Sequence, residues 1–175
     1  MGKARIFVLL IGLLFVSGCA TISKPGSIPA IGLDRVGSFK ENLSVDLIND
    51  QPNTTPQTYA GIGGYTYQAN YNEWTKFFID NLGEELKKRS VDVSETSPNK
   101  LKVKLSDFAF IQGWAKVRVN MRISLQMPDK NWSKEWVATD TSGWNGGRAF
   151  GSVIYHAIEQ LLKDSQLIEL LRVDK

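Results

Sequence analysis

The stretch that decides the fold is LKVKLSDFAFIQGWAKVRVNMRISLQM, residues 101–127. Apolar residues alternate with polar ones over residues 101–105, and the alternation resumes at Phe108, shifted by one residue. A period of two is typical of a strand with one buried face. Because one extra residue restores the buried face, the shift predicts a β-bulge near Ser106–Asp107.

The same period of two predicts further strands on both sides of the bulge. Gln112-Gly113-Trp114-Ala115 fits a two-residue hairpin turn with its glycine at the first central position. Residues 117–127 then alternate without a fault, residues 128–131 form the next turn, and residues 132–141 return as another strand. An earlier short strand is expected at residues 43–47.

Two helices are predicted, one before and one after these strands. The first has an apolar face of period 3.6 and begins after Asn70, which together with Glu73 fits an N-terminal cap. The last has a second such face and is interrupted near Asp164–Ser165. The apolar faces are Trp74, Phe77, Phe78, Leu82 and Leu86 in the first helix and Phe150, Val153, Ile154, Ala157 and Leu161 in the last. We therefore expect an α+β domain, a two-layer sandwich in which an antiparallel sheet of about four strands has two helices on one face.

The N-terminal residues have the order of a secretory signal. Lys3 and Arg5 precede an apolar run over residues 6–16, and small residues then lead to Cys19. The run of 11 residues is short for a transmembrane helix, which needs about 20. Residues 1–18 are therefore predicted to be a signal peptide.

Cys19 is the only cysteine of the chain. Val16-Ser17-Gly18-Cys19 resembles the lipobox of bacterial lipoproteins, and this resemblance implies cleavage before Cys19 and lipid modification of its sulfur and amino group. In the enterobacterial pattern an aspartate at the next position retains a lipoprotein in the inner membrane, so Ala20 favours the outer membrane. The alternative is an ordinary cleaved signal followed by an unrelated cysteine.

Residues 19–41 are rich in Pro and Gly and show no sustained period. This composition predicts that the lipidated cysteine is followed by a flexible tether, and residues 42–175 then form a single domain. The alternative is that part of the segment docks on the domain.

Removal of residues 1–18 takes away Lys3 and Arg5 and lowers the formal net charge from +3 to +1, so charge gives no reason to expect nucleic-acid binding.

Residues 49–70 are the hardest part of the chain to assign, and alternation around Tyr65-Thr66-Tyr67 favours a second strand as the alternative to a long loop. Most of the tyrosines lie in or next to this stretch. Tyr65, Tyr67 and Tyr71 combine a rigid apolar ring with a polar hydroxyl, which suits recognition of a partner. The alternative is that these rings cover the edge of the core.

The polar face of the predicted sheet is basic. Like charges gathered on one face are a candidate site for an anionic ligand, although antiparallel sheets commonly leave one face in water. A solvated charged face is therefore the alternative. The residues concerned are Lys102, Lys104, Lys116, Arg118 and Arg122.

No catalytic or metal site is predicted. His156 is the only histidine and lies four residues after Ser152 in the last predicted helix, where the pair has no orienting acid or oxyanion site. Zinc would lack its usual His and Cys ligands, and no cofactor-binding motif is complete. We expect no enzyme activity, no metal and no cofactor.

Residues from about Asn70 to Leu171 resemble the uncharacterised YajG-type bacterial lipoproteins. The likeness is in EELKKRSVDV (residues 84–93), in the strand pair at 101–127, and in AIEQLLKDSQLIELL (residues 157–171). It implies an outer-membrane lipoprotein with no established activity and no catalytic residues to transfer.

Two classes of function follow as hypotheses. The first is a non-enzymatic accessory or scaffold lipoprotein, held at the outer membrane by its lipid, facing the periplasm and binding an envelope protein complex. The second is a binding module for an anionic lipid or a cell-wall glycan, through the basic face or the tyrosines. Binding through the basic face would weaken with salt, whereas docking led by tyrosines would respond to substitutions in residues 49–70.

Overall fold

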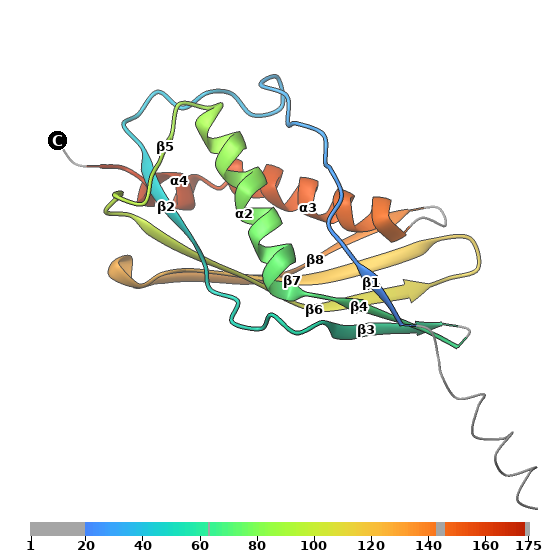
Figure 1. Ribbon diagram of the computed structural model, residues 1–175. Coiled ribbons are helices and arrows are strands. Elements are labelled where there is room, and N and C mark those ends of the chain that lie inside the picture. The colour runs from blue at the N-terminus through green and yellow to red at the C-terminus, as the bar shows by residue number, and fades with distance from the viewer. Residues whose placement is uncertain (1–19, 63, 143–145, 174–175) are drawn as a thin grey trace, which may run out of the picture.

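The computed structural model describes residues 20–62, 64–142 and 146–173 (Figure 1). The predicted signal peptide and the predicted lipidation of Cys19 lie outside these residues.

The main sheet has five strands in the order β5-β2-β6-β7-β8. Its centre is antiparallel and consists of β6 (Lys100–Gln112), β7 (Val117–Met127) and β8 (Trp132–Ser142). β2 (Ser44–Asn49) runs parallel to β6, and the short β5 (Asp92–Val93) runs parallel to β2. The predicted α+β class is confirmed, and the sheet differs from the prediction in being mixed rather than antiparallel.

The helices cover one face of this sheet (Figure 1). α2 (Tyr71–Lys87) packs over β2, β5 and β6, and α3 (Gly146–Leu162) packs over β7 and β8. A short helix, α4 (Ser165–Leu170), follows α3, and a turn of 3₁₀ helix, η1 (Pro128–Lys130), joins β7 to β8. The alternating apolar residues of β6 and β7 point into this layer and are almost completely buried, which is the expected result of their period of two.

The predicted bulge is present in β6. The pairing of β6 with β7 shifts register between Ser106 and Ala109, and Asp107 has a φ of 51°. The extra residue turns Phe108 toward the core, where its side chain is buried.

The β6–β7 turn lies one residue further along the chain than predicted. Gln112 still pairs with Val117, and Gly113 N–H donates to Lys116 O at 2.8 Å. Trp114 and Ala115 are therefore the central residues. Gly113 lies in the last pair before the turn rather than at the turn's first central position.

The predicted start of the first helix and the predicted interruption of the last helix are both confirmed. The side chain of Asn70 accepts hydrogen bonds from the N–H groups of Asn72 and Glu73 at the start of α2. Asp164 caps α4 in the same way and separates it from α3.

A second, smaller sheet lies at one end of the molecule. It consists of β1 (Ala20–Ser23), β4 (Tyr65–Ala69) and β3 (Gln57–Ile62), in the order β1-β4-β3. The stretch that resisted assignment is thus largely a hairpin, β3–β4, and β1 adds to β4 in parallel. Aromatic rings join this sheet to the core, because Tyr59 contacts Phe108 and Phe150 while Tyr67 stacks on Phe110. Tyr71 and Trp74 of α2 contact the same Phe108 ring.

Residues 20–41 lie on the domain, which differs from the flexible tether expected from their composition. After β1 the chain crosses the helices on the side opposite the main sheet (Figure 1). Ile31 and Val36 are 1% and 8% exposed, and Arg35 pairs with Glu159 of α3. Pro and Gly shape the path of this segment, while its few apolar side chains anchor it.

A buried ion pair holds the segment against α2. Arg89 is fully buried beside Glu85, to which its Nη1 donates. Its guanidinium also donates to the carbonyl oxygens of Ile31 at 3.1 Å and Val36 at 3.2 Å. Glu85 in turn accepts from Ile31 N–H at 2.9 Å. The buried side chains of Glu85 and Arg89 and the backbone groups of the N-terminal segment thus satisfy one another's hydrogen bonds without water.

A second ion cluster makes the free energy of unfolding depend on pH in the acid range. Hydrogen bonds from Lys163 and Arg35 lower the pKa of Glu159 from 4.5 to about 2, against the opposing effect of burial. The folded state therefore binds this proton less readily than the unfolded state. The stabilisation by Glu159 is complete above the unfolded pKa and is lost as pH falls from about 4.5 toward 2.

We expect Glu159→Gln to be less stable than the wild-type chain at pH 7, with a difference that shrinks as pH falls from 5 to 2. Urea unfolding of both proteins across this range measures the difference. Glu95→Gln at an exposed position is the control. A difference that stays constant over this range would contradict the assignment.

Candidate functional site

The three tyrosines predicted as a recognition surface are not brought together on the surface. Tyr67 stacks on Phe110 with ring centroids 6.1 Å apart, and Tyr71 lies 4.6 Å from Phe108. Burial raises the pKa of Tyr71. Tyr65 alone is well exposed, at 53%. Two of the three rings therefore belong to the edge of the core, as in the alternative interpretation.

The predicted basic face is divided by ion pairs. Lys102 lies 3.3 Å from Asp50, and Arg122 lies 2.6 Å from Asp107 and 2.7 Å from Glu135. Hydrogen bonds from Arg122 lower the pKa of Glu135. The middle of the face is therefore locally neutralised, as expected for a solvated surface.

Lys104, Lys116 and Arg118 have no ion pair with the described acidic residues. They do not form one site, however, because Lys104 pairs across the sheet with Ser124 while Arg118 pairs with Ile111, on the far side of the bulge. Lys116 and Arg118 lie together at the β6–β7 turn.

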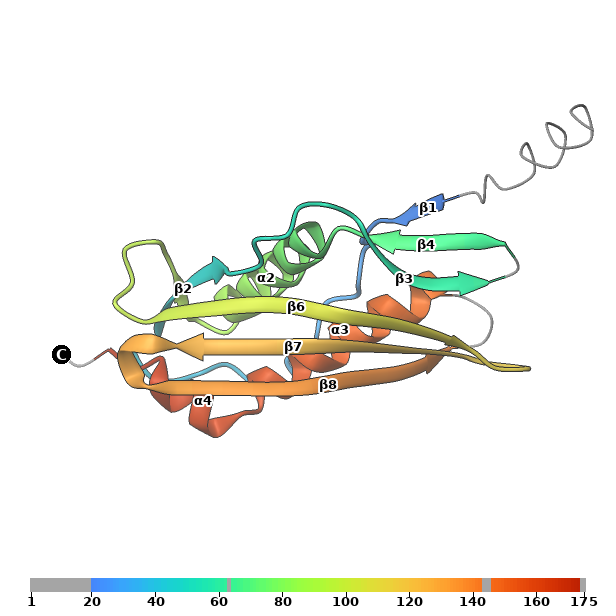
Figure 2. The same cartoon turned by 90° about the horizontal axis from the view of Figure 1, so that it is seen from below.

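That turn belongs to a surface that we call the hairpin end, defined by Ile22, Tyr65, Ile111, Trp114, Lys116 and Arg118. Figure 2 shows the β6–β7 turn, the β3–β4 turn and the start of β1 at the same end of the molecule. The strand pairing also places the start of β1 at this end, because Ala20 pairs with Thr66, next to the β3–β4 turn. Gly61 and Ile62 line one surface depression together with residues 112–115.

The hairpin end is unusually apolar for a surface. Trp114 is 95% exposed, and Ile22, Tyr65 and Ile111 are each about half exposed. Most of the large hydrophobic side chains that the described residues leave exposed are found here.

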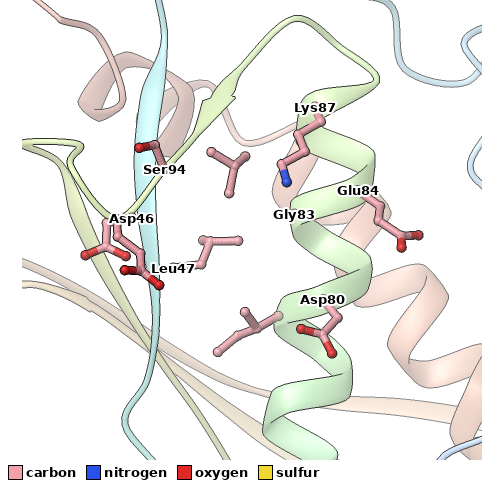
Figure 3. Close-up of a pocket in the computed structure, with 10 residues that line it drawn as sticks. Asp46, Leu47, Asp80, Gly83, Glu84, Lys87 and Ser94 are labelled. Carbon is pink, nitrogen blue, oxygen red and sulfur yellow. The ribbon is translucent and has the colours of Figure 1, made fainter.

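A cleft of about 410 Å³ lies at the other end of the main sheet, between β2 and α2 (Figure 3). We call it the edge cleft. Its floor is apolar, and Figure 3 shows the side chain of Leu47 pointing from β2 toward α2. The lining residues are Asp46, Leu47, Ile79, Asp80, Gly83, Glu84, Lys87, Val93, Ser94 and Glu95.

One side of β2 is open along the edge cleft. The N–H groups of Asp46 and Asp50 donate toward the β6 side, each at 2.9 Å. Because backbone groups alternate in direction along a strand, Leu47 points its N–H and C=O the other way. On that side β5 covers only the first two residues of β2. Among the described residues, the bond from Ser94 N–H to Val45 O is the last backbone hydrogen bond that this side of β2 receives.

Gly83 brings α2 close to the cleft floor. A Cβ at this position would meet Leu47 Cδ1 at 3.4 Å and Val93 Cγ1 at 3.7 Å. Both distances are ordinary van der Waals contacts, so α2 lies close to β2 and β5 at this position. The cleft lies beside this contact, on the exposed side of the helix.

Acidic side chains surround the edge cleft. Asp46 and Glu95 lie on the strand side, Asp80 and Glu84 lie on α2, and Lys87 is the single basic residue of the lining. Asp80 is paired with Lys76 at 2.7 Å, so Asp46, Glu84 and Glu95 supply the remaining negative charge. This excess of negative charge favours a positively charged occupant.

The structure brings an acid next to Ser152 and His156 that the sequence pattern did not reveal. Ser152 Oγ donates to Asp140 at the end of β8. His156 Nε2 lies 3.8 Å from Asp140 Oδ2, and His156 Nδ1 lies 3.6 Å from Glu159 Oε2. In a Ser-His-Asp triad the serine donates to the histidine. Here the serine donates to the acid instead, so the cluster does not reproduce that arrangement.

Two further properties of the described residues bear on function. They contain no cluster of His, Cys, Asp and Glu side chains suited to holding a metal ion. Their helices include none with the length and apolar character needed to cross a bilayer.

The comparisons with known proteins identify no family. No protein-family model matches the chain, and no curated protein matches it. Among solved structures it is similar to a "Crystal structure of uncharacterized protein" at 9% identity, with a TM-score of 0.40, over 88% of this chain and 99% of that chain. A likeness at this level supports no argument about fold or function.

Proposed function

We propose that this chain is a non-enzymatic lipoprotein of the bacterial outer membrane, of the YajG type, that faces the periplasm and acts as an adaptor in an envelope protein complex. Its partner contributes an extended, basic peptide segment that adds to the open edge of β2 in the edge cleft. The supporting observation is the backbone of Leu47, which has a free hydrogen-bonding edge beside an acid-rimmed cleft.

Strand addition suits this edge for a physical reason. An exposed strand edge offers N–H and C=O groups in the spacing that another extended chain needs. β5 has already added in this way to the first part of β2, and a partner strand would continue its line. The apolar floor would accept one side chain of the peptide, and the acidic rim would attract its basic residues.

A ligand-binding module for an anionic lipid or a cell-wall glycan is the second candidate. Only Lys116 and Arg118 favour it, because they lie together without a described acidic partner. The ion pairs of Lys102 and Arg122 make the rest of the basic face less suitable for an anion.

Leu47→Pro tests strand addition directly. Proline removes the N–H that points into the edge cleft and leaves the bonds toward β6 in place. A partner carbonyl left without its donor costs about 1–3 kcal/mol, so binding should fall roughly 5- to 150-fold. Leu47→Val keeps the N–H, changes the same side chain and should bind nearly as well as the wild type.

The measurement is in-cell photocrosslinking of the full-length protein from a benzoylphenylalanine at Ser94, followed by mass spectrometry of the crosslinked peptide. The proposal requires one partner whose crosslinked segment is extended and basic, and whose yield falls with Leu47→Pro but not with Leu47→Val. Equal yields from both variants, or a crosslink to an acidic or folded surface, would refute strand addition.

A further inference from the structure

We propose that the hairpin end is seated in the membrane interface, so that the domain rests on the lipid bilayer in one fixed orientation instead of standing away from it. The partner surface is the headgroup layer of the membrane that holds the lipid anchor. This inference rests on the proposed lipidation of Cys19.

The first argument is the distance available to the chain. Cys19 is joined by one peptide bond to Ala20, and Ala20 already pairs with Thr66 as part of the small sheet. A peptide unit spans only about 3.8 Å. A domain whose first strand begins directly after the anchor has no tether with which to leave the membrane, so the end that contains Ala20 faces the lipid.

The second argument is the chemistry of that end. Trp and Tyr are enriched where membranes meet water, because one part of each ring system is apolar and the other is polar. Trp114 is the most exposed of the large hydrophobic side chains among the described residues, at 95%, and Tyr65 lies on the neighbouring turn. Ile22 and Ile111 add apolar surface to the same end. In water these apolar side chains stay exposed, whereas in the membrane interface the lipid would cover them.

The third argument is charge. Lys116 and Arg118 lie immediately behind Trp114 on the β6–β7 hairpin, and both are exposed. Basic residues close to an anionic headgroup layer are attracted to it. An aromatic tip with basic residues behind it therefore matches the layering of apolar chains and anionic headgroups in a membrane.

This seating leaves the edge cleft accessible. The cleft lies between β2, β5 and α2, and Figure 1 shows β5 at the end of the main sheet opposite the start of β1. A domain resting on the hairpin end thus presents the edge cleft away from the lipid, toward a partner in the periplasm.

The experiment uses the full-length lipoprotein in vesicles of phosphatidylethanolamine and phosphatidylglycerol. With Cys19 lipidated, an introduced cysteine is the only free thiol. Ala115→Cys places an environment-sensitive fluorophore next to Trp114, and Glu95→Cys places it at the edge cleft as the matched control. Quenching by nitroxide lipids and by aqueous iodide is measured at both positions.

We expect nitroxide lipids to quench the label at residue 115 several-fold more than the label at residue 95, with the opposite order for iodide. Trp114→Ser should reduce lipid quenching at residue 115. Lys116→Glu with Arg118→Glu should reduce it only when phosphatidylglycerol is present. Both sites are exposed, so neither change should disturb the fold.

Equal iodide quenching of both labels in a protein that floats with the vesicles would overturn the seating while leaving the anchor intact. A protein that does not float, with an unmodified N-terminal peptide by mass spectrometry, would overturn the anchor and the seating together. Protection of residue 115 in cells but not in vesicles would assign the hairpin end to a protein partner and also overturn the inference.

Discussion

Arg89→Ala is expected to lower the free energy of unfolding by about 3–5 kcal/mol, because it leaves a carboxylate buried without its main partner. Glu85 would retain Ile31 N–H at 2.9 Å and only a distant Lys88, at 4.0 Å. The carbonyl oxygens of Ile31 and Val36 would also lose their guanidinium donor. Residues 24–41 should then detach before the rest of the domain unfolds.

Two measurements check this expectation on the full-length chain in detergent. Urea unfolding followed by near-ultraviolet circular dichroism gives the loss of stability, and limited trypsin digestion reports detachment through cleavage after Arg35 or Lys40. Lys87→Ala, two residues away on the exposed side of α2, is the control and should change stability by less than about 0.5 kcal/mol.

Removing both charges separates the ion pair from the carbonyl contacts. Replacement of a buried pair by apolar residues is often close to neutral, so Glu85→Leu with Arg89→Met should recover part of the loss. Recovery should be incomplete, because the carbonyl groups of the N-terminal segment stay without donors. A loss under about 1 kcal/mol for Arg89→Ala alone would show that the segment is held by its apolar contacts.

Phe108→Ala is expected to cost about 3–5 kcal/mol, the usual range for a large aromatic side chain in a core. Phe108 is 5% exposed, and its ring lies 4.6 Å from Tyr71, 5.6 Å from Trp74 and 5.5 Å from Phe150 between ring centroids. Its removal would leave a cavity where the two sheets and both long helices meet. The small sheet should therefore lose protection first.

Hydrogen exchange of β3 and β4 and urea unfolding together test this prediction. Tyr65→Ala removes an aromatic ring of similar size from the exposed part of the same small sheet and should stay within about 0.5 kcal/mol of the wild type. A small loss for Phe108→Ala, with unchanged exchange in β3 and β4, would mean that the small sheet is held by β1 rather than by the aromatic cluster.

Local signals in the sequence were sufficient for much of the fold. The phase shift around Ser106 gives the bulge, and Asn70 and Asp164 give two helix starts, because each of these features depends on residues close together in the chain. Strand pairing, in contrast, joins residues that are far apart in the chain. The pattern of residues 43–47 predicts a strand, but nothing local states that β2 lies beside β6 and runs parallel to it.

The docking of the N-terminal segment has no local signal either. Its Pro and Gly content describes an irregular backbone equally well whether the segment is free or docked. Ile31 and Val36 are too few to show a period, and the residue that holds them, Arg89, is more than fifty positions away. In sequence Arg89 is simply one of several cations at the end of α2.

The candidate sites were least accessible from sequence. The tyrosines and basic residues were recognised as types, but their distribution between core, solvated face and hairpin end depends on tertiary packing. The open edge of β2 has no side-chain signature, since it arises from the shortness of β5. In the sequence Trp114 is simply part of a predicted turn. Only the structure shows that its side chain is exposed beside the other apolar residues of the hairpin end.

The parallel pairing of β1 with β4 has a mechanical consequence. A pull on the proposed anchor, such as the membrane being drawn away from a bound complex, acts along β1 from its first residue. All four paired residues of β1 then bear the load together in shear, instead of separating one after another as in peeling. Further along the chain, the hydrogen bonds from Arg89 to the carbonyl oxygens of Ile31 and Val36 would bear the remaining tension. With the proposed anchor and the proposed partner both bound, the domain would form a short, stiff link between them.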